Sequence, residues 1–165
     1  MKVRISIHLY LALFLILNMQ HPNKKIMREL IEYTKKKGKG KNNSSGCFIV
    51  KGDKVISKGI STVGRYKDPT AHGEMNAVKK ICRKQKNYYL KECWIYSTQI
   101  PCPMCTSLIV WAEAKGIVWG WDGMHTWGKL NIDPKIILKT AKKKIKIFGN
   151  FLEDECLKIK GYTKR

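Results

Sequence analysis

Residues 68–78 read DPTAHGEMNAV, and residues 98–106 read TQIPCPMCT. In the first stretch a turn at Asp68-Pro69 precedes apolar positions in helical register, which predicts a helix capped at Thr70. In the second stretch two prolines open an apolar run that predicts another helix. The chain therefore places a His-x-Glu pair at one predicted helix start and a Cys-x-x-Cys pair at the other.

Short β-branched runs and further helical patterns surround these two stretches. Residues 47–50 (CFIV) and 54–61 (KVISKGIS) are joined by a Gly-Asp turn, which predicts a β-hairpin. Three more strands are expected at residues 92–98, 116–121 and 144–148, and further helices at residues 24–36 and 152–160. This alternation predicts an α/β sandwich with helices on both faces of a central sheet.

Composition allows one domain and favours a reducing environment. The chain has 165 residues, of which 44% are hydrophobic, enough for a single core. Its net charge of +21 favours anionic partners such as nucleic acid, nucleotides or lipid, although most of the excess is lysine in runs typical of a solvated surface. The scattered spacing of the six cysteines does not suggest a disulfide framework, which favours a reducing compartment such as the cytoplasm.

The N-terminus differs from the rest of the chain. Lys2 and Arg4 precede an apolar run over residues 5–17 that is shorter than a bilayer span but typical of a signal peptide. We therefore divide the chain into an extension, 1–18, and a domain, 19–165. A signal or membrane anchor, an over-long start and an extra packed helix all remain open for the extension, so membrane association or export stays possible.

Four residues in the two stretches have the chemistry of a catalytic zinc site. Zinc in such sites takes three His or Cys ligands and leaves a position for water, and His72, Cys102 and Cys105 supply that number. The cysteines, three apart in a first helical turn, face one side, and the positive helix end favours their thiolates. Glu74 is left free to move a proton from water, whose pKa zinc lowers toward roughly 7, to a departing amine.

Two other interpretations of these residues compete with an open zinc site. A closed structural site would need a fourth ligand such as His125, and the simplest alternative is a core histidine beside two buried thiols. Each motif alone is common, but their combination at two helix starts favours the open site.

The combination of His-x-Glu and Pro-Cys-x-x-Cys resembles the cytidine and deoxycytidylate deaminase superfamily over residues 23–160. DPTAHGE is similar to guanine deaminases and bacterial tRNA adenosine deaminases, PCPMC and IVWA are similar to the former, and GNFLEDECLKI is similar to the latter. The resemblance implies a cytidine deaminase-like three-layer α/β/α sandwich with a five-stranded mixed sheet. It also implies a homodimer, a Zn²⁺ cofactor on His72, Cys102 and Cys105, and hydrolytic release of ammonia with Glu74 as proton shuttle.

The same resemblance places base recognition at Ser61, Gly73 and His125. Ser61 aligns with a family asparagine and offers one hydroxyl in place of an amide, and Gly73 offers its backbone N–H. Asp122 or His125 could replace an acidic residue of guanine deaminases. We expect core packing or a dimer interface for Trp111 and Trp119, while for Trp121 and Trp127 stacking on a base is the alternative.

These observations favour a zinc-dependent, guanine-deaminase-like enzyme whose small-molecule substrate is a nucleobase or nucleoside. A tRNA-specific adenosine deaminase, with tRNA as partner, is the main alternative because of the +21 charge. A cytosine or deoxycytidylate deaminase and a non-enzymatic zinc scaffold are further hypotheses.

Overall fold

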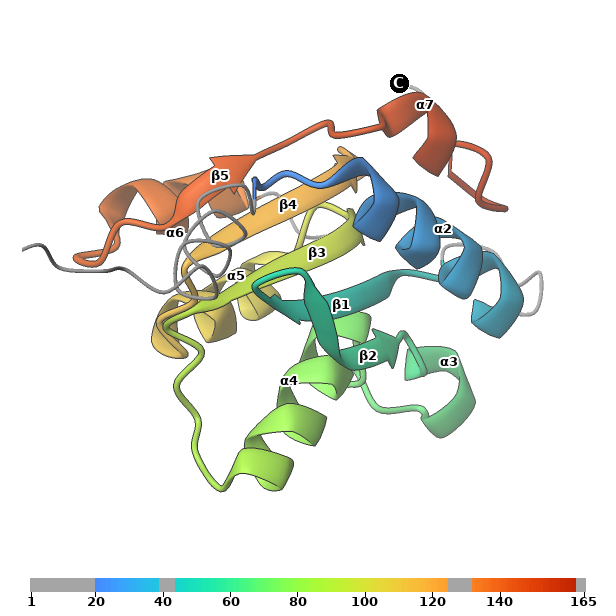
Figure 1. Cartoon of the computed structure of the whole chain (residues 1–165). Coiled ribbons are helices and arrows are strands. Elements are labelled where there is room, and N and C mark those ends of the chain that lie inside the picture. The colour runs from blue at the N-terminus through green and yellow to red at the C-terminus, as the bar shows by residue number, and fades with distance from the viewer. Residues whose placement is uncertain (1–19, 39–43, 125–131, 163–165) are drawn as a thin grey trace, which may run out of the picture.

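The computed structural model describes residues 20–38, 44–124 and 132–162. Its strands form one sheet, and helices pack against this sheet (Figure 1). In chain order the elements are α2 (Lys24–Gly38), β1 (Gly46–Lys51), β2 (Lys54–Ile60), α3 (Val63–Tyr66), α4 (Gly73–Gln85), β3 (Cys93–Gln99), α5 (Pro103–Trp111), β4 (Gly116–Trp121), α6 (Pro134–Thr140), β5 (Lys146–Phe148) and α7 (Glu153–Cys156). The sheet has the order β2-β1-β3-β4-β5. Strand β1 pairs antiparallel with β2 and β3, whereas β3, β4 and β5 are parallel. This arrangement confirms the five-stranded mixed sheet.

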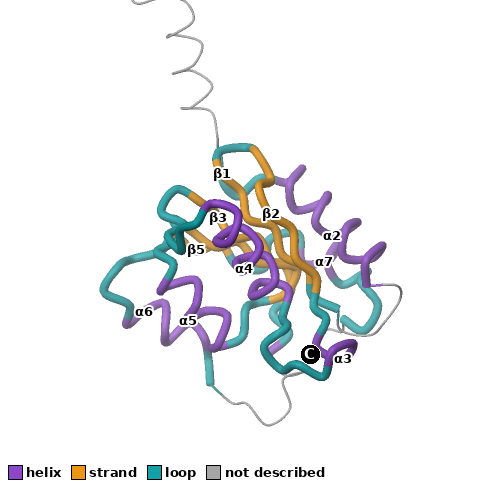
Figure 2. The backbone as a smooth tube through the Cα atoms, turned by 90° about the horizontal axis from the view of Figure 1, so that it is seen from below, coloured by secondary structure: helices purple, strands orange, loops and turns teal. Residues whose placement is uncertain are grey.

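Helices cover both faces of this sheet, as predicted. Helices α2 and α7 lie on one face, and α4, α5 and α6 lie on the other (Figure 2). The side chains of β1 pack alternately into the two layers, because successive side chains of a strand point to opposite faces. Cys47 and Ile49 join the core cluster beneath α4 and α5, while Phe48 and Val50 join the cluster beneath α2. The chain therefore forms a three-layer α/β/α sandwich.

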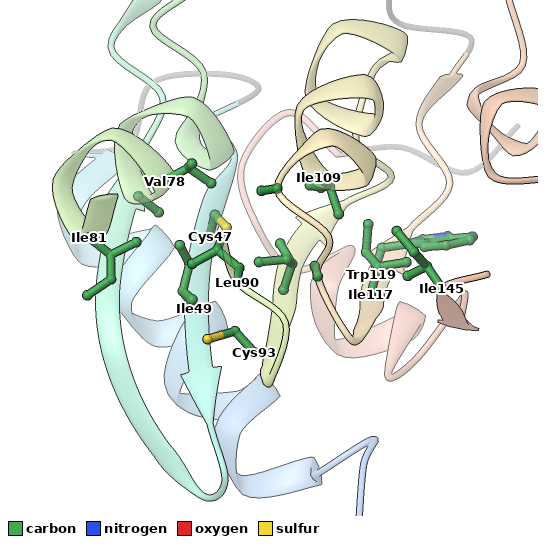
Figure 3. Packing of buried hydrophobic residues seen from close by; sticks show 14 of the residues in the cluster. Cys47, Ile49, Val78, Ile81, Leu90, Cys93, Ile109, Ile117, Trp119 and Ile145 are labelled. Atoms are coloured by element: carbon green, nitrogen blue, oxygen red, sulfur yellow. The ribbon is translucent and has the colours of Figure 1, made fainter. Parts of the chain in front are cut away.

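Close packing of aliphatic side chains holds α4 and α5 on the sheet (Figure 3). Val78 of α4 and Ile109 of α5 pack in one cluster with Ile49 of β1 and Ile117 of β4. Each such side chain contributes about 1.5–3 kcal/mol when it is fully removed from water. This burial holds both helices against the sheet, so that α4 and α5 begin at the edge where β3 and β4 end.

The first turn of α4 approaches the sheet closely because two residues lack side chains. A Cβ at Gly59 of β2 would overlap the carbonyl oxygen of Gly73, and a Cβ at Gly73 would lie 2.8 Å from the carbonyl oxygen of Ser45. Both obstacles are backbone atoms, which cannot move aside as a flexible side chain can. Backbone approaches of this kind favour glycine.

Several predicted boundaries were wrong. Thr70 does not cap α4: its N–H and hydroxyl donate to Asp68 within a turn, and the helix begins at Gly73 after His72 as the N-cap. The prediction omitted α3 and α6, although Asp133 caps α6 by accepting from the N–H of Lys135. Helix α7 is one short turn, so the predicted helix over residues 152–160 was too long.

The N-terminal extension, residues 1–18, lies outside the described residues. Within the described ranges, no helix has the length and apolar character needed to cross a membrane.

Both ring nitrogens of His21, near the start of the described residues, make hydrogen bonds. His21 Nδ1 lies 2.7 Å from the Tyr96 hydroxyl, and its Nε2 lies 2.9 Å from the carbonyl oxygen of Gly52. The N–H of Asn23 donates to the same Tyr96 hydroxyl, so that hydroxyl is free to donate to Nδ1 while Nε2–H donates to Gly52. This assignment corresponds to the neutral imidazole with its proton on Nε2. Burial lowers the pKa of His21 below its usual 6.5.

We expect stability to depend on pH through His21. Since its pKa is lower in the folded state, its contribution to the free energy of unfolding is present above about pH 6.5 and is lost as the pH falls further. His21→Gln, which does not titrate, should lose less unfolding free energy between about pH 7.5 and about pH 5.5 than the unsubstituted protein. Urea denaturation at both pH values measures the difference, and equal losses in the two proteins would contradict it.

Candidate metal centre

Three predicted ligands meet where two helices begin. His72 is the N-cap of α4, Cys102 is the N-cap of α5, and Cys105 lies in the first turn of α5. Their donor atoms all lie within 4.8 Å of one another, and His72 Nδ1 is 3.6 Å from Cys102 Sγ. Cys105 is buried, whereas His72 and Cys102 are half-buried. Residues about thirty positions apart in the sequence thus form one compact set of donors.

Local hydrogen bonds fix both helix starts. In α5, Pro103 occupies the first turn, where its missing N–H is not needed, and Thr106 Oγ1 donates to the carbonyl oxygen of Pro101 at 3.1 Å. In α4, the Asn76 amide donates to the carbonyl oxygen of Ile60 at 2.9 Å and to Thr62 Oγ1 at 3.1 Å. Asn76 therefore ties α4 to the end of β2, a role that the sequence analysis missed.

The donor set fits a divalent cation that prefers sulfur and nitrogen. Hydrogen bonding with Cys105 and then with His72 lowers the pKa of Cys102 to about 4, against the effect of burial. The pKa of Cys105 is raised by its hydrogen bond with Cys102 and by burial. The pKa of His72 is raised by its hydrogen bond with Cys102. The site therefore favours a thiolate at Cys102, and a metal would displace the remaining proton. Two thiolates and one imidazole suit zinc and leave a fourth position open.

Glu74 lies beside the donors without belonging to their set. It occupies the first turn of α4 and is 3% exposed. Its Oε1 accepts a hydrogen bond from Ser97 Oγ at 2.8 Å, and its Oε2 lies 3.6 Å from Cys105 Sγ. Burial raises the pKa of Glu74, while its own backbone N–H and Ser97 act in the opposite direction. A carboxyl group with these neighbours can both accept and return a proton.

Two of the predicted base-binding residues, Ser61 and Gly73, lie around the start of β1. The N–H of Ser61 donates to the carbonyl oxygen of Ser45 at 2.8 Å, and Gly73 packs against that same oxygen. Asp122 follows β4 directly, and its Oδ2 lies 3.4 Å from Lys135 Nζ. The predicted residue His125 lies outside the described residues.

The tryptophans divide into core and surface. Trp121 is 1% exposed and stacks on Tyr162 with ring centroids 4.2 Å apart, so it packs in the core and the base-stacking interpretation was wrong. Trp119 is also buried. Trp111 is 77% exposed, which excludes core packing and leaves the interface interpretation. Trp127 lies outside the described residues.

Comparison with known proteins places this architecture in one family. Residues 20–121 match the family described as the cytidine and deoxycytidylate deaminase zinc-binding region, so the chain belongs to this family.

Its relatives differ in the substrate class that their names give. A guanine deaminase of Bacillus subtilis (strain 168) is 39% identical over 99 residues, covering 59% of this chain and 62% of that protein. A tRNA-specific adenosine deaminase of Aquifex aeolicus (strain VF5) is 41% identical over 73 residues, covering 44% of this chain and 48% of that protein. The chain thus spans between about half and three fifths of these two relatives.

A solved structure from work on A-to-I editing by tRNA:A34 deaminases shares the fold. Its TM-score is 0.68 at 20% sequence identity, covering 82% of this chain and 99% of that one.

Removal of one ligand should remove the metal. Cys105→Ala takes away a buried sulfur of the donor set, and we expect zinc affinity to fall by more than about 100-fold. Cys47→Ala is the matched control because Cys47 is equally buried, at 0% exposure, but lies outside the cluster of donors found among the described residues.

Chelator competition with metal analysis of the purified proteins measures both affinities. Unchanged zinc affinity in Cys105→Ala, or an equal loss in Cys47→Ala, would show that the metal lies elsewhere.

Proposed function

We propose that this protein is a zinc-dependent hydrolytic deaminase of a nucleobase or nucleoside, similar to guanine deaminases. The observation that carries the proposal is the position of Glu74. A carboxylate that is 3% exposed, with Oε2 3.6 Å from the sulfur of Cys105, is costly to bury and is not needed to complete a metal site. A group that moves protons beside the metal accounts for this cost.

The residues would divide the reaction between them. His72, Cys102 and Cys105 would hold zinc, which as a Lewis acid makes water a nucleophile at neutral pH. Glu74 would accept a proton from the attacking water and deliver it to the exocyclic amine, which leaves as ammonia while oxygen replaces it on the ring. The burial of Glu74 keeps bulk water from competing for that proton.

The similarity to the Bacillus guanine deaminase supports a free purine base as substrate. We propose that Ser61 and the N–H of Gly73 contact the base, because both residues lie against Ser45 next to His72. His125 remains a proposed contact on the sequence resemblance alone. A requirement for free thiols at Cys102 and Cys105 supports a reducing, cytoplasmic location.

The net charge of +21 and the similarity to the Aquifex enzyme support the second candidate function, a tRNA-specific adenosine deaminase. RNA binding through lysines would weaken steeply with salt, whereas turnover of an uncharged base would not.

We also propose a homodimer formed through α5. No charged residue occurs in this helix, and Trp111 at its end is 77% exposed. Helix α6 packs against α5, and the side chain of its Ile136 is 57% exposed. An apolar surface of this kind on a family enzyme suits a two-fold interface.

Glu74→Gln should abolish turnover while it preserves the fold. The amide has the same shape but cannot shuttle a proton, so we expect ammonia release to fall by at least about 100-fold. Glu92→Gln is the control, because Glu92 is a surface residue paired with Lys51. The assay compares guanine, adenine, cytosine, their nucleosides and an anticodon stem-loop RNA.

Turnover of guanine by the unsubstituted protein and Glu92→Gln, but not by Glu74→Gln, is the expected result. Reaction of the RNA alone would replace the guanine assignment with the tRNA candidate, and full activity in Glu74→Gln would exclude the proposed mechanism.

Trp111→Glu should convert the dimer to a monomer, since a charge within an apolar interface lacks a partner. Tyr66→Glu is the control at another exposed aromatic residue, 65% exposed on α3. Light scattering after size exclusion gives the mass. A monomeric unsubstituted protein, or a dimeric Trp111→Glu, would rule out this interface.

A further inference from the structure

Strand β3 carries two neighbouring hydroxyl groups, Ser97 and Thr98, that are both 0% exposed. Because successive side chains alternate, the two hydroxyls lie on opposite faces of the sheet. Ser97 faces the layer of α4 and donates to Glu74 Oε1 at 2.8 Å. Thr98 faces the other layer, where its Oγ1 lies 2.8 Å from the Tyr162 hydroxyl and accepts the N–H of Gly46 at 3.0 Å. The Ser97 hydroxyl thus contacts the candidate site, whereas the Thr98 hydroxyl contacts Gly46 and Tyr162 on the other side of the sheet.

We propose that Ser97 is a positioning residue that holds the Glu74 carboxylate in a single orientation, with Oε1 toward β3 and Oε2 toward the donors His72, Cys102 and Cys105. The proposal rests on the proposed function, in which Glu74 moves the proton.

The hydrogen bond is suited to this task. A hydroxyl that donates to a carboxylate forms a strong, charge-assisted bond, and here both partners are almost fully buried. Ser97 Oγ has one hydrogen and two acceptors in reach, Glu74 Oε1 at 2.8 Å and the carbonyl oxygen of Gly46 at 3.5 Å. The shorter contact takes the hydrogen, so the carboxylate is held by a residue of the rigid central strand.

Besides Ser97, the carboxylate contacts its own backbone N–H and, at 3.6 Å, Cys105 Sγ, whose thiol is a weak donor. The last torsion of a glutamate is broad and nearly two-fold, so rotation costs little unless a partner fixes it. Without the Ser97 hydroxyl, Oε1 would lose this hydrogen bond while it stays buried, and the carboxylate would turn toward another donor. Proton transfer requires heavy atoms about 2.6–3.2 Å apart, so a turned carboxylate would reach the substrate poorly.

Three variants separate positioning from packing. Ser97→Ala removes the hydroxyl that contacts Glu74, and Ser97→Thr keeps a hydroxyl at the same position. Thr98→Val is the matched control: it removes an equally buried hydroxyl from the next residue of the same strand without touching Glu74.

With guanine as substrate, we expect kcat of zinc-loaded Ser97→Ala to fall about 10–100-fold with KM little changed, as for other residues that orient a group at a metal site. Ser97→Thr should restore most of kcat. Thr98→Val should lose stability comparably but keep its kcat. A kcat within about 2-fold of the unsubstituted protein in Ser97→Ala, or an equal fall in Thr98→Val, would overturn the proposal.

Crystal structures of zinc-loaded Ser97→Ala and Thr98→Val provide a readout that needs no substrate. Glu74 should leave its single conformation in Ser97→Ala and keep it in Thr98→Val. An unmoved Glu74 in Ser97→Ala would overturn the positioning role even if guanine is deaminated. A displaced Glu74 with no turnover of guanine by the unsubstituted protein would instead support the role and reject guanine as the substrate.

Discussion

The close contact between the first turn of α4 and the sheet is the constraint on which the rest of the site depends. Gly59 leaves room for the carbonyl oxygen of Gly73, and Gly73 in turn packs on the carbonyl oxygen of Ser45. With no side chain in between, His72 reaches the start of α5 and Glu74 reaches Ser97 on β3. A wider separation would break both contacts at once, because both residues belong to the same rigid turn.

Burial and charge are balanced at this contact. A carboxylate and two thiols lie at or near the first turns of α4 and α5, where the positive ends of the helix dipoles favour negative charge. Desolvation opposes that charge, which is why the pKa of Glu74 is raised despite its hydrogen bond with Ser97. The site is therefore polar at its centre, while aliphatic side chains of α4, α5 and the sheet surround it. This combination suits chemistry in which a buried carboxyl group moves a proton.

Sequence patterns predicted α2 and α4 because their apolar residues recur with a helical period. The strands were predicted from short apolar and β-branched runs, and α5 from the prolines that precede an apolar run. The pair of motifs also predicted which side chains would come together, since both predicted helices begin at the same edge of an α/β sheet. Short elements such as α3 and α7, of four residues each, carry too few positions for a period to show. The prediction that Thr70 caps α4 was wrong because the Thr70 hydroxyl donates to Asp68 in a local turn. Ser97 was missed because its importance comes from a contact with a residue 23 positions away, which the strand pattern around it does not reveal.

The central claim is that two helix starts form an open metal site with three protein ligands. Zinc K-edge X-ray absorption of the purified, zinc-loaded protein tests it most directly, since the distances report the ligand types. The account predicts two sulfur ligands at about 2.3 Å, and one imidazole nitrogen and one further light atom at about 2.0–2.1 Å. A shell with two imidazoles beside the two sulfurs, or with no sulfur, would contradict it.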